Sequence, residues 1–395
     1  MSLQAVEVIK KRLQERPDEI VAARQEGRKV VGWQGYNLPE EIIYALGLIP
    51  VRIGAGGDDR LVEIGARYIS TKNCVFVRET VGLFAENKDP YIQNTDFLAF
   101  DATCLQTYRT AEILQYYFHK EVIILGVPRN FYWPEAQIYF TKEIEYFTKQ
   151  LEELAGVKLD NQKLAATIAL YDQIRSAIVK IYEYQATKER FISWEETYDI
   201  IHAGYFLERR EYLSLLEQVL AEVDSKQGEP LIDAVDDEAR ILISGSVIPP
   251  GDKKLIEIIN QVGGRIVADD LWSGLIPYLD VTIPENSLQG LAIGYINRTP
   301  HGALPYLELD TDKRLLRLKE LIKTFKAQGV IYHTLRYCDP YTFKAKETKD
   351  ILQKEGIPLL EIHTEYAGSD FEAIRTRIEA FVEMIKNKNY EEEAV

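Results

Sequence analysis

The chain has 395 residues, 46% of them hydrophobic and 28% charged, and a formal net charge of −15. This length exceeds one ordinary hydrophobic core, so we expect two domains with room for a further helical segment. The acidic balance argues against nucleic acid or an anionic membrane as a partner, because neither releases counterions to an acidic surface. The longest apolar runs are strand-sized, and the charged N-terminus lacks the apolar stretch of a signal peptide. We therefore expect a cytoplasmic protein.

Strands and helices alternate in the first third of the chain. A helix is predicted at 38–47, where Pro39 falls in the first turn and Gly47 follows the last one. This alternation is typical of parallel strands joined by crossover helices, which form a doubly wound sheet. The predicted strands are 29–33, 48–53, 95–100 and 121–127.

The middle of the chain, from about 134 to 224, has a different pattern. Apolar residues recur there at helical spacing, with no convincing strand between them. An acidic, loop-like stretch at 224–239 follows and ends this helical segment. The predicted helices are 138–156, 163–185 and 212–223.

The alternation of strands and helices resumes after residue 239, which predicts a second doubly wound sheet. The predicted strands are 240–246, 265–270, 329–335 and 358–364, and the predicted helices are 252–263, 340–356 and 371–388. The fold class is therefore α/β, with two parallel-sheet domains plus a helical segment. The predicted parts are an N-terminal α/β domain at 1–133 with Cys74 and Cys104, a helical segment at 134–235, and a C-terminal α/β domain at 236–395 with Cys338.

The three cysteines of the chain all lie where a strand leads into a helix. Ligands of open α/β sheets bind outside the carboxyl ends of the strands, which is where Cys74, Cys104 and Cys338 fall. Two of them belong to the first α/β half and one to the second, so they can meet only in the cleft between the domains. The residues expected to cap the following helices are Asn73, Asp101 or Thr103, and Asp339.

A helix N-terminus favours a thiolate over a thiol, because its unpaired N–H groups and partial positive charge stabilise the anion. Thiolates are the soft ligands that suit iron–sulfur clusters. Two alternatives stay open on position alone. Free cysteines are often inert core residues. A zinc site is a weaker alternative, since it wants four ligands and only His333 lies near these motifs.

Several segments together resemble the 2-hydroxyacyl-CoA dehydratase and benzoyl-CoA reductase family, in particular subunits like the D-component of 2-hydroxyglutaryl-CoA dehydratase. The combination of a P-E-E-I helix, three separated cysteines, A-D-D-L and C-D-P carries the resemblance. It runs from about residue 28 to the C-terminus and is weakest in the helical middle. The segments are 32–53, the stretch around Cys74, 96–109, 245–274, 329–366 and 375–385.

The resemblance implies two flavodoxin-like domains and one 4Fe–4S cluster held by Cys74, Cys104 and Cys338. The fourth iron is then open to water, sulfide or a substrate oxygen. A larger, double-cubane cluster is less expected, because it needs more thiolates than three. The family also implies an ATP-hydrolysing iron–sulfur activator protein that injects one low-potential electron.

The activity implied by the resemblance is that of an acyl-CoA dehydratase (a lyase) or reductase in an anaerobic system. The cluster relays the electron to an acyl-CoA thioester and gives a ketyl radical, which expels a 2-hydroxyl group and acidifies the β-position. A homologous second subunit or a homodimer is the expected partner. The alternatives are a non-catalytic electron-transfer and docking subunit, a double-cubane reductase homodimer, and a scaffold without metal. The acyl group and the choice between dehydration and reduction are not specified by any motif.

Four further residues are weak candidates for catalytic roles. Gln34 and Tyr36 lie in the loop GWQGY, whose N–H groups can contact substrate or cluster, although a tight turn explains its glycines equally well. Asp269 and its neighbour Asp270 end a strand, where carboxylates can transfer protons, but a helix cap is the simpler explanation. His333 is more simply a core histidine than a base. The arginines near the cysteines, which can balance cluster charge or hold CoA phosphates, are Arg78, Arg109 and Arg336.

Overall fold

The computed structural model describes residues 3–226, 238–305 and 312–393, with side chains up to 387. The acidic loop expected at 224–239 therefore lies almost wholly outside the described residues. Within the described part of the chain, no helix combines the length and the apolar character that a membrane crossing requires.

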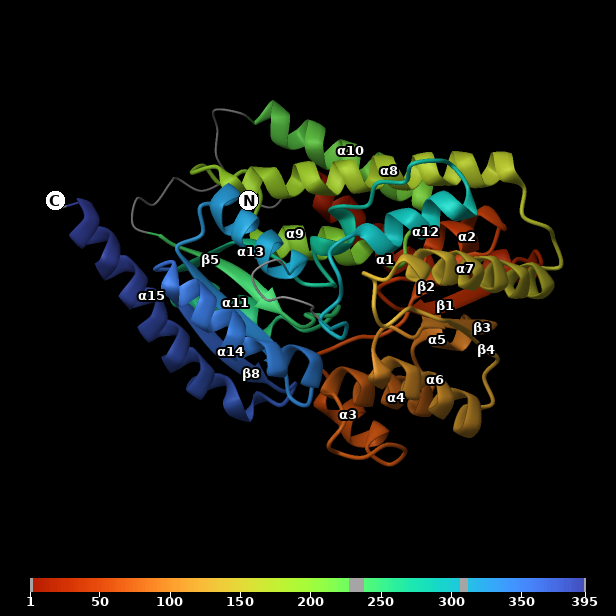
Figure 1. Cartoon of the computed structure of the whole chain (residues 1–395), viewed down its shortest axis with the longest axis horizontal. Helices are drawn as coiled ribbons and strands as arrows, with labels where there is room; N and C mark the ends of the chain where they lie inside the picture. The colour runs from red at the N-terminus through yellow and green to blue at the C-terminus, as the bar shows by residue number, and fades with distance from the viewer. Residues whose placement is uncertain (1–2, 227–237, 306–311, 394–395) are drawn as a thin grey trace.

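Two four-stranded parallel sheets form the frame of the molecule (Figure 1). The first has the order β2-β1-β3-β4 and the second the order β6-β5-β7-β8, so the two share one topology. Both place the switch in strand order beside the first strand, which is where doubly wound sheets bind ligands. All eight strands were predicted: β1 (Val30–Gln34), β2 (Ile49–Arg52), β3 (Phe97–Asp101), β4 (Val122–Leu125), β5 (Ala239–Gly245), β6 (Gly264–Asp269), β7 (Gly329–Leu335) and β8 (Leu359–Thr364).

Helices cover both sheets and build a third, helical layer along one side. The predicted long helices are present, and five others were not predicted: α3, α5, α9, α12 and α13. The helices are α1 (Gln4–Gln25), α2 (Glu40–Ala45), α3 (Asp59–Gly65), α4 (Val75–Glu86), α5 (Pro90–Asn94), α6 (Leu105–Phe118), α7 (Pro134–Ala155), α8 (Asn161–Glu183), α9 (Trp194–Ala203), α10 (Arg209–Ser225), α11 (Lys254–Gln261), α12 (Leu288–Asn297), α13 (Lys313–Thr324), α14 (Asp339–Lys354) and α15 (Phe371–Glu393), with short 3₁₀ turns η1 (Tyr184–Ala186), η2 (Ile276–Tyr278) and η3 (Gly368–Asp370).

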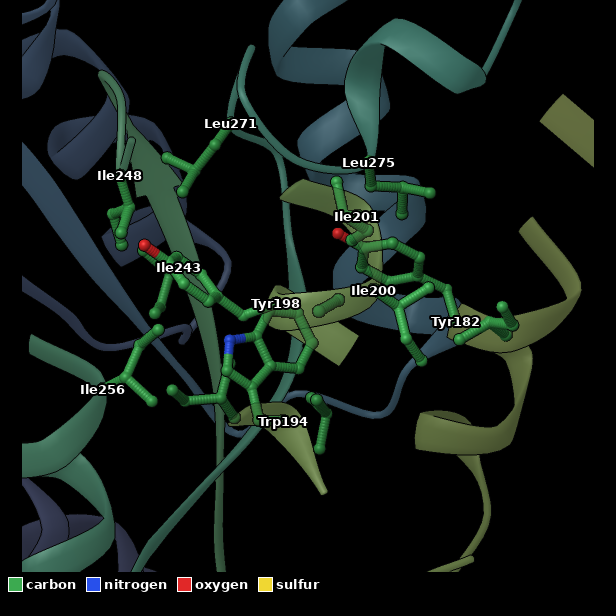
Figure 2. Close-up of a cluster of buried hydrophobic side chains, with 14 of the residues drawn as sticks. Tyr182, Trp194, Tyr198, Ile200, Ile201, Ile243, Ile248, Ile256, Leu271 and Leu275 are labelled. Carbon is green, nitrogen blue, oxygen red and sulfur yellow. The ribbon is translucent and has the colours of Figure 1, made fainter. Parts of the chain in front are cut away.

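Helix α8 joins the two halves, running along the upper side of Figure 1. Near its start, Leu164 and Ile168 pack into the core of the first sheet. Its later residues belong to the core of the second sheet, where Tyr182 meets Trp194 of α9 with ring centroids 5.7 Å apart. Figure 2 shows these two rings in one cluster of buried side chains that also includes Ile243 of β5. One helix therefore fixes the position of both sheets.

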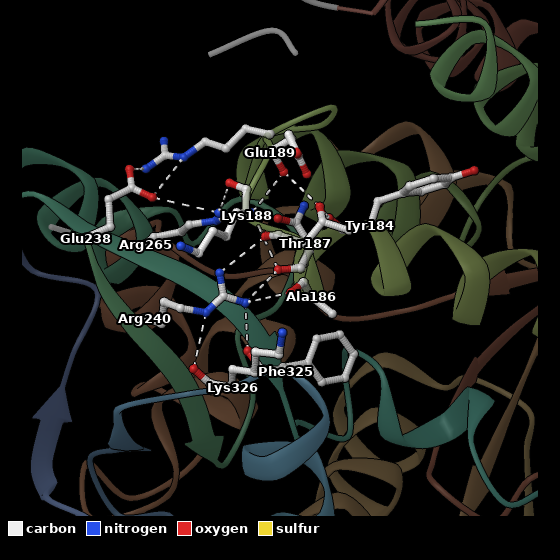
Figure 3. Close-up of polar contacts among 12 residues, drawn as sticks. Tyr184, Ala186, Thr187, Lys188, Glu189, Glu238, Arg240, Arg265, Phe325 and Lys326 are labelled. Atoms are coloured by element: carbon white, nitrogen blue, oxygen red, sulfur yellow. Dashed lines mark hydrogen bonds and ion pairs between the residues drawn. The ribbon is translucent and has the colours of Figure 1, made fainter. Parts of the chain in front are cut away.

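The helical segment is fastened to the second sheet by arginines that donate to backbone carbonyls. Arg240 of β5 donates to the carbonyl oxygens of Gln185, Ala186 and Phe325 (Figure 3). Arg265 of β6 donates to the carbonyl oxygen of Lys188 at 2.9 Å. Because these guanidinium groups are partly desolvated, the pKa of Arg265 falls to about 10.

The same segment is fastened to the first sheet by buried ion pairs. Arg175 of α8 bonds Glu41 at 2.8 Å, and Tyr295 of α12 donates to the other oxygen of that carboxylate. Glu40 is held by Arg209 of α10. Helix α12 thus packs on the first half of the molecule, although it lies in the C-terminal third of the sequence.

Candidate functional site

All three cysteines line one pocket between the two sheets, with a free space of about 560 Å³. Cys104 follows β3 and Cys338 follows β7, so the carboxyl ends of the two sheets face each other there. Cys74 comes from the long connection between β2 and β3. Gly56 N–H donates to Pro250 O at 2.9 Å and Val75 N–H to Arg336 O at 3.4 Å, which ties the two loop regions together around the pocket.

Each cysteine is itself the residue that precedes a helix: Cys74 before α4, Cys104 before α6 and Cys338 before α14. The prediction that neighbouring polar residues take these cap positions was therefore wrong, for a local reason in each case. Asn73 instead donates its side-chain amide to Ser70 O. The remaining expected caps are used elsewhere: Asp101 accepts from the N–H groups of Asn37 and Thr103, and Asp339 is already the first helical residue.

A side-chain hydrogen bond links the thiols of Cys74 and Cys338. This hydrogen bond lowers the pKa of Cys74, and the N–H groups of Val77 and Phe76 lower it further against the opposing effect of burial. The same contact raises the pKa of Cys338 well above its usual value, with burial acting in the same direction. The pair therefore carries one thiolate more readily than two.

Cys104 stands apart from that pair. Burial raises its pKa, because the thiolate is the form that loses solvation, while the N–H groups of Thr107 and Gln106 oppose the shift. The negative charge of a Cys74 thiolate raises it further. A positively charged group in the pocket is therefore required before all three sulfurs ionise together.

Gln34 and Tyr36 both line the pocket, as the loop after β1 passes directly beside the thiols. Gln34 is 1% exposed, and neither its Oε1 nor its Nε2 has a hydrogen-bond partner. Gly35 lies against the Asp101 carboxylate, where a Cβ would stand 2.5 Å from Cγ, so this loop requires glycine. The Tyr36 hydroxyl donates to Thr299 O at 2.7 Å.

Asp269 and His333 do not line the thiol pocket. Asp269 accepts from the Tyr182 hydroxyl at 2.6 Å and from the N–H groups of Leu271 and Leu275, so it closes the turn after β6. His333 is 1% exposed and bonds Thr364 through Nε2 at 2.7 Å. Burial lowers the pKa of His333 to about 3, which keeps the ring neutral.

Of the three arginines near the cysteines in sequence, the structure brings one to a thiol. Arg78 is buried, donates to Asn73 O, and its charge contributes to lowering the pKa of Cys74. The other two are solvent-exposed and form surface ion pairs: Arg109 with Glu112 and Arg336 with Glu365.

A second pocket of about 700 Å³ adjoins the first and was not anticipated from the sequence. The two share Tyr36, Trp272, His301 and Tyr341 as walls. Three of these carry signals that were available: Trp272 follows A-D-D-L, Tyr341 follows C-D-P, and His301 is one of five histidines. Their meeting is invisible in the sequence, because it depends on how the two halves dock.

Asp270, next to Asp269, faces this second pocket. Its carboxylate accepts from the Ser244 hydroxyl at 3.1 Å and from Gly245 N–H at 3.2 Å. Burial raises the pKa of Asp270 to about 7, and the charge of Asp269 adds to the shift. Of the two adjacent carboxylates, Asp270 is therefore the one placed to exchange a proton with a bound molecule near neutral pH.

Within the described residues, no three His, Cys, Asp or Glu side chains are spaced to hold a single metal ion. Thiolates are the usual ligands of iron–sulfur clusters, in which each binds a separate iron. Three helix-capping thiols and an unpaired buried amide at Gln34 are compatible with such a group.

Fold and site together define a class of two-domain α/β proteins with a thiol pocket between their sheets. Residues 36–385 match the family model described as 2-hydroxyglutaryl-CoA dehydratase, D-component. The chain belongs to that family.

Curated relatives match nearly the whole chain. One subunit of the benzoyl-CoA reductase of Thauera aromatica is 24% identical over 376 residues, which cover 93% of this chain and 95% of that protein. The beta subunit of lactoyl-CoA dehydratase of Anaerotignum propionicum is 24% identical, with 91% and 92% covered. The beta subunit of (R)-2-hydroxyglutaryl-CoA dehydratase of Acidaminococcus fermentans is 22% identical, with 92% and 94% covered.

Proposed function

We propose that this chain is the iron–sulfur subunit of a radical 2-hydroxyacyl-CoA dehydratase or benzoyl-CoA-type reductase. Cys74, Cys104 and Cys338 would hold a 4Fe–4S cluster, which when bound supplies a low-potential electron for an acyl-CoA thioester. An ATP-dependent activator protein delivers that electron. The relatives named above are subunits, so a homologous second subunit or a second copy of this chain completes the enzyme.

The observation that carries the proposal is the meeting of the three thiols in one pocket. They come from positions 74, 104 and 338, yet all three cap helices that point their N-termini at the same space. Three inert core cysteines have no reason to share this position. The N–H groups there stabilise thiolates and tune the potential of a bound cluster.

The chain's own residues have three tasks in this chemistry. Tyr36, Trp272 and Tyr341 wall the space between the thiols and the second pocket, and so exclude water from a reacting group. The second pocket offers room for an acyl group. Asp270 holds a proton on its carboxylate near neutral pH and so can receive or return one there.

The cluster is tested by purifying the chain without oxygen and measuring iron and acid-labile sulfide, with an EPR spectrum after reduction. We expect about four irons per chain, and loss of iron in Cys74→Ala, Cys104→Ala and Cys338→Ala. Leu105→Ala is the matched control, because Leu105 is next to Cys104 and 63% exposed. About eight irons would indicate the double-cubane type of cluster. No iron, with three thiols that titrate freely on unfolding, would refute the cluster.

A second candidate function is electron transfer without substrate contact. The adjoining pocket, which shares Tyr36, Trp272, His301 and Tyr341 with the thiol pocket, favours the catalytic role over this one. The two are separated by titrating the reduced chain with acyl-CoA thioesters and following the EPR signal. A shift of the signal that is lost in Trp272→Ala supports substrate binding here, and an unchanged signal with every thioester supports the electron-transfer role.

A further inference from the structure

A third pocket, of about 670 Å³, lies behind the wall of the thiol site. Gly35, Tyr36 and Trp272 separate it from the cysteines, since they line both spaces. The rest of its lining comes from β1 and β2, the start of α2, the helical segment, the turn around η2 and the end of α12. We call it the arginine pocket, because four guanidinium groups line it: Arg52, Arg175, Arg209 and Arg298.

Two of these four arginines are neutralised by carboxylates. Arg175 bonds Glu41 at 2.8 Å, and Arg209 bonds Glu40. Within the described residues, neither Arg52 nor Arg298 has a carboxylate close enough for an ion pair. The arginine pocket therefore holds two guanidinium groups without an ion-pair partner among the described residues, although the charge of Arg298 interacts with the Asp101 carboxylate at longer range.

Arg52, at the end of β2, is 8% exposed and stands among aromatic rings. Its guanidinium carbon lies 4.1 Å from the ring centroid of Tyr205 and 5.3 Å from that of Trp272. Its Nη2 donates a long hydrogen bond to Trp272 O at 3.5 Å, and its side chain also hydrogen-bonds Tyr205. A guanidinium has five N–H donors, so these two contacts leave donors of Arg52 for a ligand.

Arg298 is buried still more deeply, at 3% exposure. Its guanidinium carbon lies 3.8 Å from the ring centroid of Tyr36 and 4.6 Å from that of Tyr295. Its Nε and Nη2 have no hydrogen-bond partner, and neither does Nη2 of Arg209. Stacking on rings satisfies the faces of these guanidinium groups and leaves their N–H edges without acceptors.

A buried cation with unpaired donors costs several kcal/mol, as an order of magnitude, unless an anion accompanies it. Tyr278 lines the same pocket. Burial raises the pKa of Tyr278; the charges of Arg52, Arg209 and Arg175 act against that shift, and the charge of Glu40 adds to it. Arg298 shares this space through its place in the pocket lining.

We propose that the arginine pocket binds a small carboxylate with an apolar body, held at its carboxylate by Arg52 and Arg298. Planar guanidinium edges match a carboxylate in two-point geometry. The aromatic walls, which include Trp33 and Tyr205, suit an apolar remainder of the ligand. Glu40 also lines the pocket and disfavours a second negative charge, so a monoanion fits better than phosphate. This site does not depend on the cluster, because the wall of Tyr36 and Trp272 separates the two spaces.

The test is calorimetric titration of the full-length chain, prepared without oxygen, with hexanoate, hexanamide and inorganic phosphate. We expect saturable binding of hexanoate, no binding of the neutral amide, and weaker binding of phosphate. Arg298→Gln and Arg52→Met should each weaken hexanoate binding about tenfold or more, since each removes a charge-assisted contact. Arg298→Lys, which keeps the charge, should retain more affinity than Arg298→Gln.

Thermal unfolding supplies the second readout. Hexanoate should raise the unfolding midpoint of the wild-type chain and of Arg60→Gln, a control on an exposed arginine, but not that of the two pocket variants. The proposal is overturned if no carboxylate binds saturably, or if hexanoate binds equally well to the wild type and to both folded pocket variants. Phosphate binding more tightly than hexanoate would overturn the choice of a carboxylate.

Discussion

The two sheets have the same strand order and differ in what their strand ends carry. The third strand of each is followed by a thiol, Cys104 after β3 and Cys338 after β7. The second strands end in residues of opposite type: the last residue of β2 is the basic Arg52, and the last residue of β6 is the acidic Asp269. The end of the third strand thus carries a cysteine in both halves. The end of the second strand contributes to the arginine pocket in the first half and to the carboxylate pair Asp269 and Asp270 in the second. A shared topology fixes where a site lies, and the strand-end residues decide its chemistry.

The halves also differ in how the helical segment is attached to them. On the first half it is attached by buried ion pairs, such as Arg175 with Glu41. On the second half Arg240 donates to neutral backbone carbonyls. The ion pairs there are more exposed to solvent: Arg190 with Glu238 and Lys253 with Asp199. Removing a cation from an ion pair leaves a buried charge behind, whereas removing it from carbonyls leaves only weaker acceptors unpaired. The first attachment should therefore be the more sensitive to a single substitution.

The largest effect is expected for Arg175→Met. This substitution leaves the Glu41 carboxylate, which is 0% exposed, without its cation. It should lower the free energy of unfolding by about 3–5 kcal/mol. Arg240→Met, the matched change on the second half, should cost about 1–3 kcal/mol. Urea unfolding of the two variants measures the difference. Adding Glu41→Gln to Arg175→Met should recover part of the loss; equal costs for the two single variants would contradict the comparison.

A second test concerns Gly245, which ends β5 where Gln34 ends β1. Gly245 has φ of +122°, and an added Cβ would overlap the carbonyl oxygen of His333 in the neighbouring strand. Gly245→Ala should therefore lower the free energy of unfolding by about 3 kcal/mol. Gly27 has φ of +90° and no atom within 4 Å of its Cβ position, so Gly27→Ala should cost only about 1 kcal/mol. Chemical denaturation measures the free energy of unfolding of each variant. The difference between the two losses gives the cost of atomic overlap, because Gly27→Ala reports backbone strain alone.

The sequence predicted this frame well because its strands are short apolar runs separated by turn residues. It failed at helices whose signals are weak or local. The sequence signal for helix α9 is a capping box alone, in which the side chains of Ser193 and Glu196 each bond the other's backbone N–H. Helix α12 contains two glycines, which lower its helical propensity. The thiols were found because cysteine is rare in this chain. The arginine pocket was not found, because Arg52 and Arg298 are 246 positions apart and reach one pocket only when α12 packs on the first half.

The carboxylates at the end of β6 predict that the free energy of unfolding depends on pH. The equivalent strand end of the first half, at the end of β2, carries Arg52 and predicts no such dependence. The folded-state pKa of Asp270 is about 7, above its unfolded value. Between those two values the folded chain holds a proton that the unfolded chain releases, so this contribution to stability is complete at low pH and is lost as pH rises toward 7. Asp270→Asn should flatten the decline in unfolding free energy measured from pH 5 to 8. An unchanged slope would show that Asp270 is ionised in the folded chain.

The smallest effect is expected at the thiols themselves, in iron-free protein. Cys104 precedes α6 with the extended backbone of an ordinary N-cap, φ −107° and ψ 132°. A serine there can accept from the N–H groups of the first turn, so Cys104→Ser should be about 1 kcal/mol more stable than Cys104→Ala.

Cys338 has ψ of 74°, away from the extended region, so the same pair of substitutions should differ less there. Thermal unfolding of the four iron-free variants gives both differences. If the Ser and Ala variants differ more in stability at position 338 than at position 104, the backbone geometries described for the two N-cap positions are contradicted. A serine that supports the helix yet abolishes iron binding would separate the two roles of this position, because a hydroxyl can cap a helix but is a poor ligand for iron–sulfur clusters.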